Sequence, residues 1–202
     1  MNSNHFPQNE KIGFLRKTTL VDFPEHIACA VFLIGCNLRC PYCYNKDLVL
    51  INENSQKDDF STLDEVFKHL ELRKNVLSGI TISGGEPLLH PATPLIIKYA
   101  KNLGYKIKLD TNGTNPLELE KLIKNDQLCP DYVAMDIKAS SNCYSLVTGV
   151  INPFLDNIKE SINILKKFQS GSACSPRTPA QEIPTHTRII NPIQAKTSSI
   201  VF

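Results

Sequence analysis

Short apolar runs alternate with amphipathic segments along most of this 202-residue chain. The run at 27–34 is continuous and partly β-branched, which is typical of a strand buried on both faces of a sheet. Each run is separated from the next by a segment with helical spacing. Three further runs, at 80–82, 105–109 and 132–135, predict the strands that follow it.

Start and stop signals mark the helices between these strands. Thr62 and Glu65 have the spacing of a capping box at the start of an amphipathic segment. A second helical pattern begins at Pro94 and runs to Leu103, after which Gly104 suits the C-terminal cap. The remaining signals are an Asn115 cap followed by Pro116, and a helix face formed by Phe154, Ile158, Ile162 and Leu165.

The alternation of strand and helix predicts the fold class. Repeated βα units are typical of a parallel sheet with right-handed connections. We therefore expect an α/β fold, either an open sheet or one curved into a partial (βα) barrel of parallel strands. In both architectures the carboxyl ends of the strands meet at one edge, where ligand sites form. A polar cluster follows each predicted strand, so we expect all of these clusters at that edge.

The character of the sequence changes after Phe168. Residues 169–185 are rich in Ser, Pro, Gly, Ala and Thr and lack periodicity, as linkers and disordered tails do. We predict one core domain at 1–168 and a Ser/Pro-rich tail at 169–202, with a short fifth strand at 187–190. Residues 45–60 are polar and are expected to form an exposed connection.

The amino-acid composition and net charge limit the classes of molecule that this protein is expected to bind. Hydrophobic residues make up 42% of the chain and charged residues 21%, which are globular values, and the net charge is +2. A balance so close to neutral argues against binding nucleic acid or anionic membranes through charge alone. No apolar run approaches the ~18 residues of a membrane span, and the first run lies too far from the N-terminus for a signal peptide. We therefore expect a cytoplasmic protein that binds neither nucleic acid nor membrane.

The seven cysteines are unevenly distributed. An odd number without a secretion signal argues against a disulfide framework. Cys36, Cys40 and Cys43 lie within eight residues, directly after the first predicted strand. Three thiolates at this spacing suit a [4Fe–4S] cluster whose fourth iron keeps an open coordination position. A zinc site, which requires a fourth ligand from elsewhere in the fold, and unligated cysteines are the alternatives.

A glycine pair follows the second predicted strand. Gly84 and Gly85 let the backbone approach a ligand closely, and the adjacent Glu86 carboxylate can receive a ligand ammonium group. Such a pair on its own is more often an ordinary turn.

Carboxylates end the third and fourth predicted strands. Asp110 and Thr111 begin a segment that is typical of an Asx turn. Asp136 and Lys138 alternate onto one side of their strand, where they form either a buried ion pair or part of a ligand site. Together at one sheet edge, these groups can position a zwitterionic, cationic ligand.

The segment Cys36-Asn-Leu-Arg-Cys40-Pro-Tyr42-Cys43 resembles the signature loop of the radical S-adenosylmethionine (SAM) superfamily. The resemblance implies that the open iron chelates SAM and that one electron cleaves SAM to methionine and a 5′-deoxyadenosyl radical. It also implies that Tyr42 lies against the adenine. Residues 83–87 match the Gly-Gly-Glu-Pro element that binds the methionine amino group in this family.

Within that superfamily, the combination resembles the activating enzymes of glycyl-radical proteins. The resemblance implies that Lys138 meets the SAM carboxylate. It also implies that Asp110, Thr111 and Asp136 contact SAM or a monovalent cation. Residues 12–168 are similar to activating proteins of anaerobic ribonucleoside-triphosphate reductase. This similarity implies a glycyl-radical enzyme as the partner, with reduced flavodoxin or ferredoxin as the electron donor.

Two departures from that family pattern affect the expectation. Tyr44 stands where close relatives often have His. The relatives also continue into further strands after the last helix, whereas a Ser/Pro-rich stretch follows here, so we expect an atypical or truncated C-terminal end.

Two other functions stay open at this stage. One is a small-molecule radical SAM enzyme that acts on a deazapurine precursor, as 7-carboxy-7-deazaguanine synthase does. The other is a non-catalytic iron–sulfur or zinc module, a class that includes electron carriers.

Overall fold

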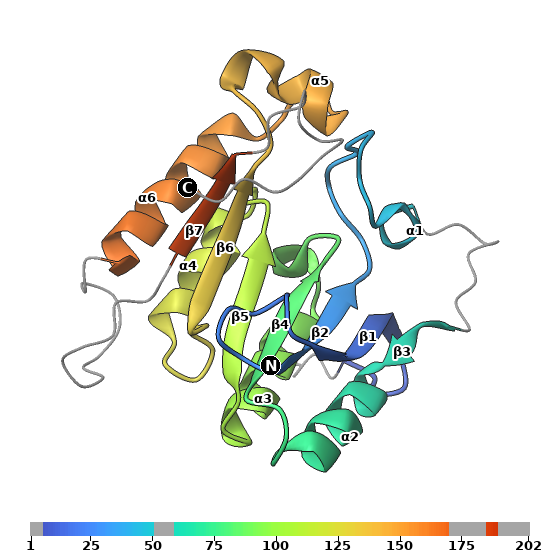
Figure 1. Cartoon of the computed structure of the whole chain (residues 1–202). Coiled ribbons are helices and arrows are strands. Elements are labelled where there is room, and N and C mark those ends of the chain that lie inside the picture. The colour runs from blue at the N-terminus through green and yellow to red at the C-terminus, as the bar shows by residue number, and fades with distance from the viewer. Residues whose placement is uncertain (1–5, 51–58, 170–184, 190–202) are drawn as a thin grey trace.

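The computed structural model describes residues 6–50, 59–169 and 185–189. Their strands form one sheet in the order β3-β1-β2-β4-β5-β6-β7 (Figure 1). The strands are β1 (Lys11–Thr19), β2 (Ala28–Leu33), β3 (Ser61–Thr62), β4 (Gly79–Gly84), β5 (Lys106–Thr111), β6 (Tyr132–Ile137) and β7 (Thr185–Ile189). The α-helices are α1 (Lys46–Val49), α2 (Leu63–Arg73), α3 (Ala92–Asn102), α4 (Pro116–Lys124), α5 (Tyr144–Thr148) and α6 (Leu155–Gln169), with 3₁₀ turns η2 (Pro87–Leu89) and η3 (Ser141–Cys143).

Strands β2, β4, β5, β6 and β7 pair with one another in parallel, which confirms the predicted α/β fold. In β4 and β5 apolar side chains alternate with polar ones: Ile80 and Ile82 of β4 and Ile107 and Leu109 of β5 are buried in the main hydrophobic core. Residues from α2, α3, α4 and α6 belong to the same core, so these helices cover one face of the sheet. β7 lies beside β6 close to the place where a fifth strand is expected, while the division at residue 168 stays a prediction.

Two outer strands, β3 and β1, complete the sheet beside β2, and the sequence analysis missed both of them. β1 pairs antiparallel with β2 on one side and with β3 on the other. Only part of β1 is covered, because Ile12 and Gly13 are buried while Arg16 and Lys17 are exposed. A strand with this mixture of basic and apolar residues lacks the continuous apolar run that identified the central strands.

The helix caps are largely as predicted. The Thr62 side chain accepts from the Glu65 N–H at 3.2 Å, and the Glu65 carboxylate accepts from the Thr62 N–H at 2.6 Å, which completes the capping box. The Asn115 side chain accepts from the Glu118 N–H at the start of α4. Gly104 follows α3 with a φ of +89°, as its cap position requires.

Several local predictions were wrong. α3 begins at Ala92 rather than at Pro94. Phe154 precedes α6 with a φ of 57° and is partly exposed, so it does not belong to the buried helix face. Residues 45–60 are not simply an exposed connection, because α1 lies there and Leu48 is buried, and residues 51–58 lie outside the described part. The short helix α5 was not predicted at all.

The opposite face of the sheet carries small and polar side chains. Ala28 of β2 packs with Phe23, Tyr132 and Ala134 in a second, smaller apolar cluster. Phe23 lies in the connection between β1 and β2, so this connection covers the face near the amino ends of the parallel strands. The polar residues toward the carboxyl ends stay available for a site.

His90, at the end of η2, makes stability depend on pH. Its Nδ1 accepts from the Ala92 N–H at 3.1 Å, and burial lowers the pKa of the ring to about 4. A folded-state pKa below the ordinary value of 6.5 means that the neutral ring stabilises the fold above pH 6.5 and that this contribution is lost as the pH falls toward 4.

We therefore expect wild type to lose about 1 kcal/mol relative to His90→Asn, which keeps an acceptor but does not titrate, between pH 7 and pH 5. This magnitude is discounted for the partial exposure of the ring. Urea denaturation at the two pH values measures the difference. An equal stability gap at both would contradict the assignment.

Candidate functional site

The three predicted metal-ligating cysteines lie on the loop that follows β2. Gly35 turns the chain there with a φ of +85°, and its N–H donates to the Leu48 carbonyl at 2.7 Å. The Cys43 N–H donates to the Cys40 carbonyl at 3.1 Å, which closes a tight turn between these two cysteines. Cys36 and the other two are free thiols of intermediate exposure. The loop thus presents all three sulfur atoms from one short segment.

The thiols lie close enough to influence one another. Burial raises the pKa of Cys36, and the charges of Glu86, Cys40 and Cys43 add to this increase. Burial also raises the pKa of Cys40, while the Lys138 ammonium opposes the change.

Three thiol donors on one loop have the ligand chemistry of an iron–sulfur cluster. Across the described residues, no three His, Cys, Asp or Glu side chains converge on a point that would hold one metal ion. A cube-shaped [4Fe–4S] cluster does not require such convergence, because each thiolate binds a different iron. Three neighbouring thiols on one loop therefore suit the cluster that the sequence predicts.

The glycine pair at the end of β4 lies directly against the cysteine loop. The Gly85 N–H donates to the Leu33 carbonyl, and the Glu86 N–H donates to the Gly35 carbonyl, both at 2.8 Å. A Cβ atom on Gly85 would lie only 1.9 Å from the Gly35 oxygen. Gly84 has a φ of +111°, and a Cβ atom there would lie 2.3 Å from the Leu33 backbone nitrogen. These glycines are needed for close backbone approach, and not only for a turn.

The Glu86 side chain is buried in the protein rather than exposed at the carboxyl ends of the strands. Its side chain is 1% exposed, and its Oε1 accepts from the Leu88 N–H at 3.1 Å and from the Thr111 hydroxyl at 2.7 Å. Its Oε2 accepts from the Asn112 N–H at 2.7 Å. Burial raises the pKa of Glu86 to about 7 although these hydrogen bonds oppose the shift. Protein donors thus occupy the carboxylate, and its expected contact with a ligand ammonium group stays a prediction.

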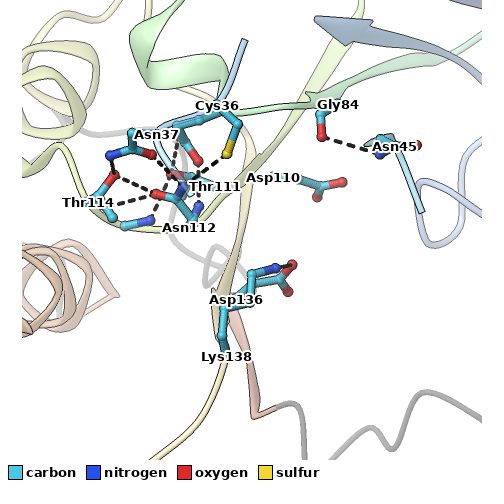
Figure 2. Close-up of polar contacts among 12 residues, drawn as sticks. Cys36, Asn37, Asn45, Gly84, Asp110, Thr111, Asn112, Thr114, Asp136 and Lys138 are labelled. Carbon is cyan, nitrogen blue, oxygen red and sulfur yellow. Dashed lines mark hydrogen bonds and ion pairs between the residues drawn. The ribbon is translucent and has the colours of Figure 1, made fainter. Parts of the chain in front are cut away.

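Two Lys–Asp pairs end β5 and β6. Lys108 pairs with Asp110. Lys138 Nζ lies 2.9 Å from Asp136 Oδ2 (Figure 2). The two carboxylates keep 30% and 32% exposure, whereas Lys108 keeps only 6%. The aspartates are therefore the members of this group that a ligand can reach most easily.

In each pair, the opposite charge of the partner counteracts the pKa shift that burial causes. Burial raises the pKa of Asp110, while Lys108 opposes the increase. Burial alone would lower the pKa of Lys138, but Asp136 outweighs it and the net shift is upward. Lys138 is therefore a cation at neutral pH.

Tyr42 points its hydroxyl into the protein. The Oη atom is buried and lies next to the Cys40 side chain. Burial raises the pKa of this hydroxyl, and the neighbouring Cys40, Tyr144 and Asp136 add to the effect. Whether the ring contacts an adenine stays a prediction.

The fold brings the predicted residues to one edge and adds others that the sequence analysis missed. Lys108 could have been found from its two-residue spacing to Asp110, which places both side chains on one face of a strand. Tyr144, which accepts from the Lys138 N–H at 3.3 Å, had no comparable signal. Three further polar residues, Asn37, Asn112 and Thr114, form hydrogen bonds next to Cys36 (Figure 2).

Sequence comparison finds relatives for most of the chain. A family model described as the radical SAM superfamily matches residues 31–175. A putative glycyl-radical enzyme activating enzyme, MJ1227 of Methanocaldococcus jannaschii, is 38% identical over 125 residues, which are 61% of this chain and 48% of that protein. The pyruvate formate-lyase-activating enzyme of Clostridium pasteurianum is 34% identical over 145 residues, covering 69% and 57% of the two chains.

A third relative has a different activity. The 7-carboxy-7-deazaguanine synthase of Aquifex aeolicus is 37% identical over 82 residues, which are 41% of this chain and 34% of that protein. This chain thus spans about half the length, or less, of these relatives.

Solved structures share the fold. QueE from Escherichia coli has a TM-score of 0.51 and 15% identity, covering 92% of this chain and 85% of that one. TYW1 with a lysine-pyruvate adduct bound has a TM-score of 0.53 and 19% identity, covering 81% and 54%. At such identities the likeness concerns the fold alone, and it agrees with the predicted partial barrel. Among the described helices, none has both the length and the hydrophobicity of a membrane span.

The family match includes every element that carries the candidate site. It begins within β2, just before the cysteine loop, and extends beyond α6. The family implies a [4Fe–4S] cluster and SAM as cofactors, and the three neighbouring thiols have the donor chemistry that such a cluster requires. The chain belongs to the radical SAM superfamily.

Proposed function

We propose that this protein cleaves SAM reductively at a [4Fe–4S] cluster and generates a glycyl radical on a partner enzyme. The observation that carries the proposal is the meeting of three thiols, a close glycine pair and two Lys–Asp pairs at one sheet edge. The glycyl-radical activating enzymes among its relatives support the reaction class.

Each part of the site has a role in this proposal. Cys36, Cys40 and Cys43 would hold the cluster, which when bound supplies the electron that breaks the sulfonium C–S bond. The Lys138 ammonium would hold the carboxylate of SAM, because it is a cation that remains partly accessible. The Asp110 carboxylate, whose side chain keeps 30% exposure, would face the positive end of the ligand.

A monovalent cation would lie near the same carboxylates. Asp110 of β5 and Asp136 of β6 offer oxygen atoms on neighbouring strands. Thr111 follows Asp110 and pairs in register with Met135, the residue before Asp136. Oxygen donors of this type suit hard cations. The Thr111 hydroxyl already donates to Glu86, so its contribution would come from the backbone carbonyl.

The proposed partner is anaerobic ribonucleoside-triphosphate reductase or another glycyl-radical enzyme. Reduced flavodoxin or ferredoxin would supply the electron in the cytoplasm. The similarity to a 7-carboxy-7-deazaguanine synthase supports a second candidate, in which the substrate is a small deazapurine precursor.

One experiment separates these functions. The full chain is reconstituted anaerobically, reduced with dithionite and supplied with SAM, and release of 5′-deoxyadenosine is measured. We expect release, and after addition of the reductase we expect the doublet of a glycyl radical in the electron paramagnetic resonance spectrum. A reductase whose radical-bearing glycine is replaced by alanine is the control and should give no doublet.

Two results would change the conclusion. Turnover of SAM without a doublet on any glycyl-radical enzyme tested, but with conversion of a deazapurine precursor, would support the second candidate. Stoichiometric zinc in the protein with intact SAM would contradict both.

A further inference from the structure

Asn37, Asn112 and Thr114 form a closed ring of hydrogen bonds beside the cysteine loop (Figure 2). Asn112 Nδ2 donates to Asn37 Oδ1 at 3.1 Å, and Asn37 Nδ2 donates to Thr114 Oγ1 at 2.8 Å. Thr114 Oγ1 then donates to Asn112 Oδ1 at 2.7 Å. Every side chain in the ring both donates and accepts, so the direction of each hydrogen bond is determined by the others.

This ring determines which way the Asn112 amide points. Its Oδ1 also accepts from the Thr114 N–H at 3.0 Å, so the oxygen faces two donors and the amide cannot be reversed without losing both. The second hydrogen of Nδ2 is then directed at Cys36 Sγ, 3.9 Å away. The Leu38 N–H approaches the same sulfur at 3.4 Å. Two N–H donors thus face Cys36 Sγ, and donors at these positions favour negative charge on the sulfur.

Glu86 keeps Asn112 in place by accepting hydrogen bonds from it and from the residue before it. Its Oε2 accepts from the Asn112 backbone N–H, and its Oε1 accepts from the hydroxyl of the preceding Thr111. All three residues are buried, and so is Thr114. The carboxylate therefore positions the residue that contacts the cysteine.

We propose that Asn112 is a positioning residue that stabilises the reduced cluster through an N–H···S contact to Cys36, and that Glu86 maintains its orientation. The inference rests on the proposed role of Cys36 as a cluster ligand. Reduction adds negative charge, part of which resides on the ligand sulfur atoms. A hydrogen-bond donor stabilises that charge and raises the midpoint potential.

The test is the potential of the reconstituted cluster, measured by a redox titration that is followed by electron paramagnetic resonance. For Asn112→Ala we expect the ratio of reduced to oxidised cluster at a fixed potential to fall about threefold, which corresponds to a decrease of about 30 mV for a one-electron couple. Asn112→Asp keeps the shape but replaces the donor with a carboxylate, so we expect a larger decrease. Asn157→Ala is the matched control, because it removes a hydrogen bond to the Thr114 carbonyl without touching sulfur.

A double-mutant cycle tests the role of Glu86. In Glu86→Gln, an NH2 group replaces one of the two carboxylate oxygens, so the side chain no longer presents an acceptor to both the Leu88 and the Asn112 N–H groups, which face different oxygens. We expect this variant to lower the potential, and we expect the double variant with Asn112→Ala to match Asn112→Ala alone. Fully additive decreases would show that Glu86 does not act through Asn112.

Other outcomes are equally decisive. Unchanged potentials in both Asn112 variants would overturn the inference while leaving the proposed function intact. Failure of wild type to assemble a cluster would overturn both. A shifted potential in a protein that forms no glycyl radical would support the inference and contradict only the proposed substrate.

Discussion

Cys40→Ala should abolish the release of 5′-deoxyadenosine from SAM. The substitution removes one of three thiols on the loop after β2, and a cluster that retains only two protein ligands is not held at this edge. Loss of a supporting contact at a metal site costs up to about 100-fold, so we expect the loss of a ligand to exceed that factor. Product chromatography after reduction with dithionite measures the effect, and iron and sulfide analysis shows whether a cluster was present.

Cys143→Ala provides the matched control. Cys143 lies in η3, is exposed and is also a free thiol, so its replacement changes the cysteine content without changing the loop. We expect wild-type iron content and wild-type SAM cleavage in this variant. If Cys40→Ala cleaved SAM as well as Cys143→Ala does, the assignment of the loop cysteines as ligands would be wrong.

Gly85→Ala should disrupt both the fold at the site edge and the binding of SAM. The added Cβ atom would lie 1.9 Å from the Gly35 carbonyl oxygen, and no side-chain rotation can relieve a clash with backbone. The end of β4 must move away from the cysteine loop, which breaks the hydrogen bond from the Glu86 N–H to the Gly35 carbonyl. We expect a loss of about 3 kcal/mol or more, at the upper end of the cost of overpacking.

Gly104→Ala separates this steric effect from the general cost of replacing a glycine. Gly104 has a φ of +89° but open space around its Cα, so alanine there incurs only the backbone penalty of about 1 kcal/mol. Urea denaturation of the apoprotein measures both losses, and calorimetric titration with SAM measures binding to the reconstituted protein. Equal stability of the two variants would show that the β4 end is not packed against the loop as described.

The central part of the fold could be predicted because its strands are buried on both faces. A continuous apolar run such as that of β2 is a local signal, and so are the Thr62 capping box and the Asn115 cap. β1 and α5 lack such signals, since the first is only partly covered and the second is a single short turn of helix. Their existence depends on neighbours that are distant in sequence.

In the candidate site, too, only the features that have a local sequence signal could be predicted. The spacing of Cys36, Cys40 and Cys43 is a property of eight consecutive residues, and it was sufficient to predict a cluster-binding loop at the end of a strand. The role of Glu86 could not be predicted, because a carboxylate after two glycines is expected to face a ligand. Its occupied oxygens were revealed only by contacts with Thr111 and Asn112, which lie 25 and 26 residues away.

By itself, then, the sequence determined the parallel βα order, the thiol donors and the set of polar groups at the strand ends, because each of these depends on local periodicity or spacing. Only the tertiary structure decided which of those polar groups face outward and which ones bind each other. The Glu86–Asn112–Cys36 chain and the Lys108–Asp110 pair depend on strand register and burial, which arise when distant segments pack together.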